Sequence, residues 1–307
     1  MEKVLVTGAN GFVGQHVVDT LQQYDCEIIG LTKSSEIDDT LAQKLDVHVV
    51  CDLTKPEQVA ELALQGITGV INLAGIAVNN PNEPDSANLI STNISVHTNL
   101  YEQFMRQGVS PRIIAVSSGA VYSPNQPMPL TEDSELASGA TAYVASKIAM
   151  EQAIKPYTTM GLDIIITRPF NHTAPLQGPS FLVPDWAERL STLEKGQSVD
   201  VSRLGSWRDF LDARDVAAAY TSILQTPEHQ LTTDTYNICS GRPLQTYHVI
   251  QLLANELGVE LPFEEKPSSE SVIYGSSDTL TQDTGWKQKI PLEKTIRDFA
   301  NWYSSKL

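Results

Sequence analysis

The sequence predicts an α/β fold in which a doubly wound parallel sheet is followed by a smaller C-terminal lid. Short apolar runs that are typical of buried strands alternate with segments of helical periodicity up to residue 167. Because helices connect successive strands, the strands should run parallel and the helices should cover both faces of the sheet. The alternation stops after 168–175, so the rest of the chain is expected to build the lid.

Length and composition are typical of a globular protein with one large α/β domain or two smaller ones. The chain has 307 residues, of which 41% are hydrophobic and 19% are charged. Its formal net charge of −16 makes it a poor candidate for binding nucleic acid or an anionic membrane. Phosphates would therefore have to be bound by local devices, such as helix N-termini and single arginines.

Cysteine usage and the first residues predict a cytoplasmic protein. The three cysteines, Cys26, Cys51 and Cys239, are scattered without paired spacing, which favours free thiols over a disulfide framework and predicts no metal site. The chain enters a strand-like run at once, and no apolar stretch is long enough to span a bilayer. We therefore expect neither a signal peptide nor a membrane partner.

A glycine-rich turn joins the first strand to the first helix. The strand is expected at 3–7, and Gly8, Gly11 and Gly14 follow it. Gly8 and Gly11 allow a tight turn and close approach of a pyrophosphate, and Gly14 lets the helix pack on the sheet. The spacing is G-x-x-G-x-x-G rather than G-x-G-x-x-G, and the alternative is a turn without a ligand. The strand before the turn and the helix after it favour a Rossmann dinucleotide-binding domain. His16, on this helix, is expected to be a surface side chain.

The second strand, expected at 27–31, indicates which dinucleotide is bound. Enzymes that prefer NAD usually place an acidic residue after this strand to hold the ribose 2′-hydroxyl. Here Thr32, Lys33 and Ser34 follow, and a cation with hydroxyls suits a 2′-phosphate. NADPH is therefore favoured and NADH remains possible, with a plain polar loop as the alternative interpretation.

The remaining strands of the sheet are predicted from further apolar runs. The third strand ends in Asp52 and Leu53, where a carboxylate is suited to an adenine amino group. The fourth strand runs into Gly75, where backbone can pass close to a cofactor. The expected segments are strands at 47–51, 70–75, 112–118 and 162–167, and helices at 86–107 and around Tyr143.

The predicted domain boundaries follow from these segments. Residues 1–169 form the dinucleotide-binding domain, and 212–240 return to it. Residues 170–211 and 241–307 are expected to be mainly substrate-binding. In this second half the patterns predict helices at 216–224, 247–257 and 292–303, and a strand at 235–239.

Tyr143 and Lys147 are four residues apart, so a helix places them on one face, about one turn apart. A nearby ammonium lowers the pKa of a phenol, which can then exchange a proton with a carbonyl oxygen or an alcohol. Taken alone, such a pair is more often a half-buried aromatic beside a solvated charge. The glycine turn supplies the context that favours the catalytic interpretation.

Taken together, these motifs resemble the extended short-chain dehydrogenase/reductase family, of the NAD-dependent epimerase/dehydratase type. The resemblance runs essentially from end to end. It rests on 7–14, Asp52-Leu53, 72–75, Asn93, Ser117-Ser118, Tyr143-x-x-x-Lys147, 168–171 and 208–215.

The resemblance implies a role for each matching residue. Ser118, Tyr143 and Lys147 would be the catalytic set: Tyr143 exchanges the proton, Ser118 hydrogen-bonds the same oxygen, and Lys147 holds the nicotinamide ribose. The expected cofactor-binding residues are Gly8, Asn10, Gly11, Phe12, Val13, Gly14, Thr32, Lys33, Ser34, Asp52, Leu53, Leu73, Ala74, Gly75, Asn93, Tyr143, Lys147 and Pro169. The expected substrate-binding residues are Ser118, Asn171, Val183, Arg208 and Lys266.

Some of these roles have open alternatives. Arg208 is expected to bind the diphosphate of a nucleotide sugar, because a guanidinium can bind two phosphate oxygens at once. A salt bridge with Asp209 or Asp212 is the alternative. His172 is equally compatible with a substrate contact and with a packing role. The family also implies a homodimer, formed through the helices at 86–107 and 142–157.

Within the family, several stretches are similar to the reductases that act on GDP-4-keto-6-deoxyhexoses, and they imply reduction of the 4-keto group. Dehydratases of the same family carry a Glu, often preceded by Asp, just after the catalytic Ser or Thr. This chain has Gly119 and Ala120 there, and neither can transfer a proton. A C4 epimerase that retains NAD and a non-catalytic, NADP-sensing protein remain as alternatives.

Overall fold

The structure, a computed structural model, describes residues 2–77, 86–138, 141–193, 200–261 and 271–307. Its main element is a parallel, seven-stranded sheet with the strand order β3-β2-β1-β4-β5-β6-β9. The strands are β1 (Glu2–Thr7), β2 (Cys26–Thr32), β3 (Val47–Val50), β4 (Gly69–Asn72), β5 (Arg112–Val116), β6 (Asp163–Pro169) and β9 (Thr235–Ile238). The strand order reverses between β1 and β4, which is where open α/β sheets bind ligands beyond the strand ends. The predicted doubly wound α/β fold is confirmed.

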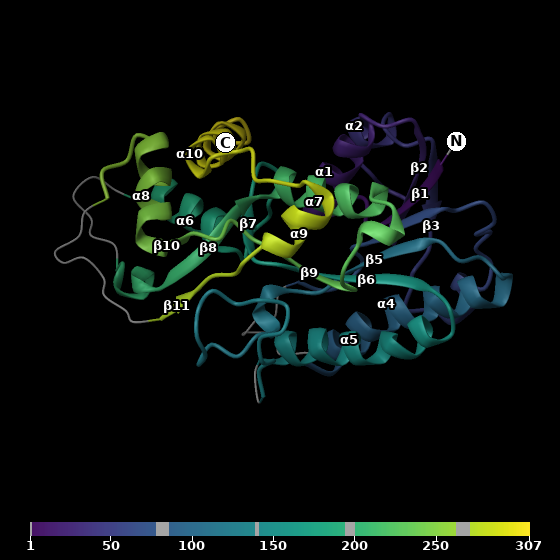
Figure 1. Cartoon of the computed structure of the whole chain (residues 1–307). Coiled ribbons are helices and arrows are strands. Elements are labelled where there is room, and N and C mark those ends of the chain that lie inside the picture. Colours follow the sequence, from purple (N-terminus) through teal and green to yellow (C-terminus); the bar gives the residue numbers. More distant parts are fainter. Residues whose placement is uncertain (1, 78–85, 139–140, 194–199, 262–270) are drawn as a thin grey trace.

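Helices cover both faces of this sheet (Figure 1). α4 (Ser86–Gln107) and α5 (Ala142–Thr159) pack side by side on one face. α1 (Phe12–Leu21) and α7 (Ala213–Gln225) pair on the other. Alternate residues of β1 explain why both faces need a cover, since Val4 and Val6 belong to one buried apolar cluster and Leu5 to the other. Three shorter helices also lie around the sheet: α2 (Asp39–Ala42), α3 (Pro56–Val59) and α9 (Asp278–Thr284).

A second, smaller layer stands at the carboxyl ends of the strands. Its centre is β8 (Trp207–Asp212), which runs parallel to β7 (Asn171–Thr173) and β11 (Val272–Ile273) and antiparallel to β10 (Pro243–Gln245). The sequence did not predict this small sheet. It packs with α6 (Leu182–Ser191), α8 (Thr246–Glu256) and α10 (Leu292–Ser304) around a separate apolar cluster. Short 3-10 turns occur at Gly119–Val121, Ser202–Gly205 and Glu228–Gln230.

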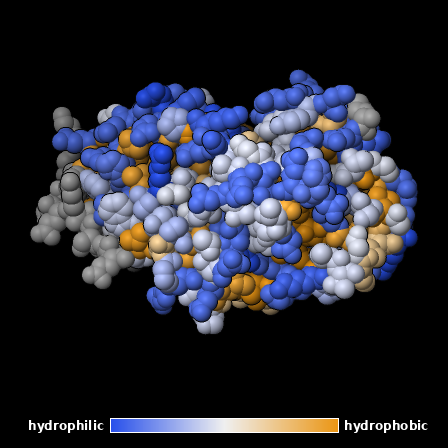
Figure 2. Space-filling view, viewed as in Figure 1, coloured by the Kyte–Doolittle hydropathy of each residue, from blue (hydrophilic) through white to orange (hydrophobic). Residues whose placement is uncertain are grey.

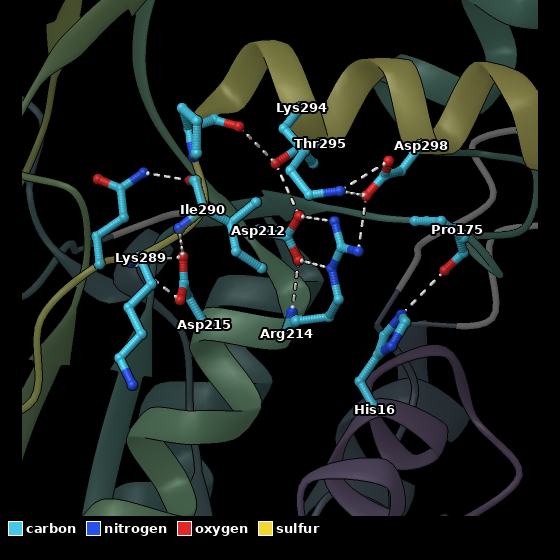
Figure 3. A network of polar contacts seen from close by, with 12 residues as sticks. His16, Pro175, Asp212, Arg214, Asp215, Lys289, Ile290, Lys294, Thr295 and Asp298 are labelled. Atoms are coloured by element: carbon cyan, nitrogen blue, oxygen red, sulfur yellow. Dashed lines mark hydrogen bonds and ion pairs between the residues drawn. The ribbon is translucent and has the colours of Figure 1, made fainter.

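Polar contacts connect the start of α7 to the last helix (Figure 3). Asp212 caps α7 by accepting from Arg214 N at 2.8 Å, and its carboxylate also binds the Arg214 guanidinium at 2.6 Å. Thr295 of α10 donates to the same carboxylate at 2.7 Å, and Arg214 reaches Asp298 at 2.8 Å. The two layers are therefore joined by a charged network around the buried Asp212 carboxylate as well as by the chain.

His16 corrects one expectation from the sequence. It is 5% exposed rather than on the surface, and its Nε2 lies 2.9 Å from the carbonyl oxygen of Pro175 (Figure 3). The contact joins α1 to the segment that follows β7. An apolar periodicity could not reveal it, because the partner is a backbone atom that is distant in sequence.

The molecular surface is mostly polar in the view of Figure 2, where hydrophobic residues form separate patches between hydrophilic ones. Within the described residues, none of the helices combines the length and the apolar character needed to cross a bilayer.

Candidate active site

A cavity of about 920 Å³ opens at the carboxyl ends of the central strands and extends beneath the smaller layer. Both layers contribute to its lining. The predicted site residues that line it are Gly8, Gly11, Phe12, Val13, Gly14, Leu73, Gly75, Ser118, Tyr143, Lys147, Pro169, Asn171, Val183 and Arg208. Gly8 and Arg208, which are 200 positions apart in the sequence, therefore meet in one space, as the doubly wound fold predicts.

The glycine turn forms the floor of the cavity. Gly8 has a φ of +65°, which a side chain would strain. A Cβ on Gly14 would lie 2.2 Å from the Gly8 carbonyl oxygen, and one on Gly11 would lie 3.0 Å from it. Gly11 is also the N-cap of α1, and no side chain caps that helix or adds an acid to its first turn. The free N–H groups and positive helix end fit a pyrophosphate, so the residues present fit a dinucleotide.

Asn93 shapes the neighbouring loop and is not among the residues that line the cavity. Its Oδ1 accepts from Ile76 N at 2.7 Å, and its Nδ2 donates to Ile76 O at 3.0 Å and to Ser146 Oγ at 2.9 Å. Gly75 has a φ of +155°, and a Cβ there would lie 2.8 Å from the Asn93 Oδ1. Asn93 thus holds the β4–α4 connection against α5, close to the expected cofactor path.

Ser118 and Tyr143 both line the cavity and lie next to each other. Ser118 follows β5 and caps the 3-10 turn by accepting from Ala120 N at 3.2 Å. Tyr143 lies in the first turn of α5, which the Thr141 side chain caps. Burial raises the pKa of Tyr143, and its hydrogen bond with Ser118 lowers it in part. The phenol therefore carries its proton at neutral pH.

Lys147 occupies the next turn of α5, as the spacing predicted. Its side chain is buried, and its Nζ donates to the carbonyl oxygen of Val116 at 2.9 Å. Burial lowers the pKa of Lys147 to about 8, against the opposite effect of the Glu151 carboxylate. The expected lowering of the Tyr143 pKa by this ammonium is not seen, because burial dominates at the phenol and the ammonium is directed at a backbone oxygen.

Arg208 reaches the cavity from β8 without an ion pair among the described residues. Its Nη1 donates to Trp207 O at 2.8 Å and to Ser271 O at 3.2 Å. The alternative salt bridges are not formed: Asp209 accepts from the backbone N–H groups of Ser240 and Gly241, at 2.7 Å and 2.9 Å, and Asp212 binds Arg214. The guanidinium is thus available to an anion.

The charges of the cavity lining have one sign. Lys147 and Arg208 are cations, and the described lining contains no carboxylate and no thiol. In a chain with a net charge of −16, this concentrates positive potential where phosphates would lie. The same composition leaves Tyr143, Tyr220 and His172 as the other titratable groups of the described lining.

Residues expected at the adenosine end lie together at the ends of β2 and β3. Lys33 Nζ and Asp52 Oδ2 form an ion pair of 3.0 Å. Thr32 is buried, and its hydroxyl bonds to Ser34 O at 2.6 Å and His48 Nε2 at 2.7 Å, so it is turned away from solvent.

Other predicted residues lie beside the cavity or outside the described residues. Asn10, Thr32, Lys33, Ser34, Asp52, Leu53, Ala74 and Asn93 are not part of the cavity lining. Lys266 lies outside the described residues.

The structure adds Phe170 and Tyr220 to the cavity lining, and it also places there His172, whose role the sequence left open. The His172 ring stacks on Phe12, with centroids 6.0 Å apart, and its Nδ1 lies 2.8 Å from Phe170 O. Burial lowers the pKa of His172, which keeps the imidazole neutral. Phe170 is packed so closely that a Cβ on Gly119 would lie 2.7 Å from its ring. Tyr220 of α7, which is buried, lines the cavity too. The sequence could not identify Tyr220 as a site residue, because it lies in an ordinary helical pattern and only folding brings it to the cavity.

The described residues contain no cluster of three or more histidine, cysteine, aspartate or glutamate side chains that could hold a metal ion. The three cysteines are free thiols.

Comparison with known proteins is consistent with this geometry. Across its full length the chain is 29% identical to GDP-6-deoxy-D-mannose reductase of Pseudomonas aeruginosa, of which it covers 98%. It is 26% identical to GDP-6-deoxy-D-talose 4-dehydrogenase of Aggregatibacter actinomycetemcomitans, over 94% of this chain and 90% of that protein. The solved structure of RMD from Pseudomonas aeruginosa complexed with NADPH superposes with a TM-score of 0.83 at 27% identity and covers 100% of both chains. Residues 4–239 match the NAD dependent epimerase/dehydratase family. The chain therefore belongs to this family of NAD(P)-dependent enzymes.

Proposed function

We propose that the protein is an NADPH-dependent reductase of the 4-keto group of a nucleotide-activated 4-keto-6-deoxyhexose. The proposed substrate is GDP-4-keto-6-deoxymannose, and the product is GDP-rhamnose or its C4 epimer. The observation that carries this proposal is the described cavity lining, which places Ser118, Tyr143 and Lys147 together without a carboxylate or a thiol.

The proton requirements of the possible reactions favour ketone reduction. Removing water from a sugar, or epimerising carbons beside the ketone, needs acid and base groups beyond one tyrosine. The positions that follow Ser118 are Gly119 and Ala120, and the Phe170 ring fills the space beside Gly119. Reduction needs only a hydride and one proton, and the described residues can supply that proton.

Tyr143 is the proposed proton donor. When it is bound, the nicotinamide supplies the hydride that adds to the ketone carbon. Tyr143 gives its proton to the ketone oxygen, and Ser118, its neighbour in the cavity lining, hydrogen-bonds the same oxygen. Lys147, one helical turn from Tyr143 and fixed by the Val116 carbonyl, keeps a positive charge in the same cavity lining as the phenolate that forms.

Two exposed or unpaired cations support the proposed ligands. Arg208 can bind two diphosphate oxygens at once, because no acidic side chain of the described residues pairs with it. Lys33 pairs with a largely buried carboxylate, since Asp52 is 15% exposed, but its own side chain is 78% exposed and can turn to a 2′-phosphate. The Pseudomonas structure that this chain resembles is complexed with NADPH, which also supports the cofactor choice.

Turnover of GDP-4-keto-6-deoxymannose with NADPH tests the proposal. We expect stoichiometric consumption of NADPH, with Tyr143→Phe reducing kcat by about 100-fold or more while leaving NADPH binding intact. Tyr24→Phe, an exposed tyrosine, is the matched control. Unchanged turnover in Tyr143→Phe contradicts the mechanism. Tightly bound NAD without net consumption would identify a C4 epimerase, and NADPH binding without turnover a sensing protein.

The base of the nucleotide sugar is tested separately. Comparing GDP, dTDP and UDP sugars should show the lowest KM for the GDP sugar. Arg208→Ala should raise KM for each nucleotide sugar, whereas Arg189→Ala, an exposed arginine on α6, should not.

We also propose that the protein forms a homodimer in solution. The support is the family resemblance and the pairing of α4 with α5 as one layer on the sheet (Figure 1). Sedimentation at several concentrations should show twice the mass of the chain, and a monomer throughout would refute this.

A further inference from the structure

A buried ion pair lies directly behind the candidate catalytic residues. Arg168 of β6 and Glu151 of α5 form two contacts, from Nε to Oε1 at 3.0 Å and from Nη2 to Oε2 at 2.7 Å. Both side chains are almost completely buried, at 8% and 2% exposure. Removing two charges from water costs free energy, and this loss of hydration offsets most of the attraction between the charges. A buried ion pair therefore contributes little to stability by itself. Its position suggests another role.

Glu151 lies close to both parts of the candidate catalytic set, which are the strand end with Ser118 and the helix with Tyr143 and Lys147. Ser117, immediately before Ser118, donates to Glu151 Oε1 at 2.5 Å. On α5 the carboxylate stands one turn beyond Lys147, and its negative charge favours the ammonium form. One side chain therefore reaches the strand end that carries Ser118 and the helix that carries Tyr143 and Lys147.

Arg168 extends the same network along the sheet toward β9. Its Nη1 donates to the Tyr122 hydroxyl at 2.9 Å and to Glu132 O at 3.1 Å. Tyr122 in turn donates to Asn237 Oδ1 of β9 at 2.7 Å. The pair is thus held between α5, β6 and the segment that follows β5, and Tyr122 links it to β9, which leaves the Glu151 carboxylate little freedom to move.

We propose that Glu151, fixed by Arg168, is a positioning residue that orients Ser118 through Ser117 and maintains the positive charge of Lys147. Among the residues that the structure describes, few charged or titratable groups face Lys147. Tyr143 and Glu151 lie on α5 with Lys147, and Arg168 of β6 lies behind Glu151. His97 faces Lys147 from α4. Burial, with the nearby ammonium, lowers the pKa of His97, so this ring is neutral. Of the described carboxylates, Glu151 is therefore the one whose charge favours the protonated form of Lys147.

The charge role is tested with Glu151→Gln, which keeps the shape and removes the charge. The protein is labelled with ¹³C at the lysine Cε, and the Lys147 signal is assigned by its loss in Lys147→Met. We expect the pKa of Lys147 to fall by about one unit or more in Glu151→Gln. Asp163→Asn is the matched control, because Asp163 pairs with Arg112 at 2.7 Å at the opposite end of β5 and β6. It should leave the Lys147 signal unchanged.

An unchanged Lys147 pKa in a folded Glu151→Gln protein overturns the charge role. If that variant does not fold, the double variant Glu151→Gln/Arg168→Met removes both charges and is judged by the same criterion. This measurement needs no substrate. It therefore remains informative if the reductase activity proposed above, on which the kinetic test below rests, is not found.

The positioning role is tested with Ser117→Ala, which removes one hydrogen bond and no charge. We expect kcat to fall about tenfold or more at constant KM, because misplaced catalytic groups mainly affect the reacting state. The pH profile should keep its alkaline limb in Ser117→Ala and shift to lower pH in Glu151→Gln. A wild-type kcat in Ser117→Ala overturns the positioning role.

Discussion

Acid should destabilise this fold through His97, which is buried neutral beneath the active site. The ring is 1% exposed, and its Nδ1 lies 3.0 Å from Asn72 Nδ2 and 3.0 Å from the Tyr101 hydroxyl. Asn72 Oδ1 accepts from Thr7, so the amide nitrogen of Asn72 must donate to the imidazole. His97 Nδ1 is therefore an acceptor. Protonation would place an N–H there that faces the N–H of Asn72, so two donors would meet without an acceptor. Burial, helped by the nearby ammonium of Lys147, lowers the pKa of His97 to about 3.

The magnitude and its sign follow from that pKa. An unfolded histidine titrates near 6.5, so between 6.5 and about 3 the unfolded chain binds a proton that the folded chain does not. Stability is therefore complete above this range and falls as the pH falls through it. Each pKa unit corresponds to about 1.4 kcal/mol, so His97 alone should cost about 2 kcal/mol at about pH 5 and about 5 kcal/mol in total. Folded domains have roughly 5–15 kcal/mol of stability, so this loss is large.

Equilibrium urea unfolding of the wild type and His97→Gln between about pH 8 and pH 5 measures the effect. Glutamine keeps an acceptor for Asn72 but does not titrate, so the variant should lose less stability per pH unit below about pH 6.5. Fluorescence of the four tryptophans and circular dichroism must report coincident transitions for the comparison to be valid. His248→Gln, an exposed histidine on α8, should run parallel to the wild type. Equal slopes for the wild type and His97→Gln would refute the reasoning.

Three further predictions concern the site and the contact between the layers. In the direction of ketone reduction, kcat/KM should fall as the pH rises through about 8, because Lys147 then loses the proton that stabilises the developing phenolate; a flat profile would exclude Lys147 from this role. Gly14→Ala should weaken NADPH binding about tenfold or more in a fluorescence titration, because its Cβ would clash with the Gly8 carbonyl oxygen, whereas Gly178→Ala, with open space around it, should bind normally. Asp212→Ala should cost roughly 2–4 kcal/mol and lower Tm, because it removes the α7 cap and leaves Arg214 half-paired; an unchanged Tm would show that Asp298 alone satisfies Arg214.

Local patterns were sufficient for the parallel sheet and its helices. The helix expected at 86–107 has those bounds in the structure, and the strands expected at 47–51 and 235–239 are shorter by one residue each. These elements have long apolar periodicity or β-branched runs, and they need no distant information. The small sheet was missed, because β7, β10 and β11 have three, three and two residues. Segments that short form only when β8 offers them a partner.

The candidate site was predicted where a backbone device or a helical spacing specifies it. The glycine turn and the Tyr143–Lys147 pair are of this kind. The surroundings of the individual side chains were not predictable. Burial raises the pKa of Tyr143, the Lys147 ammonium binds a backbone carbonyl oxygen, and the Thr32 hydroxyl bonds to His48. Each depends on atoms that folding brings from other strands. The same is true of Glu151, which is an ordinary helical residue in the sequence.

The way in which the chain alternates between the two sheets limits how the protein can be divided. After β6 the chain builds β7 and β8 of the small sheet, returns as α7 and β9, and then leaves again to form β10 and α8. A fragment that stops at residue 169 would expose the edge of β6 and leave α1 without α7. No single cut therefore releases an autonomous dinucleotide-binding piece. Truncation or proteolytic nicking within 170–240 should therefore unfold both layers together.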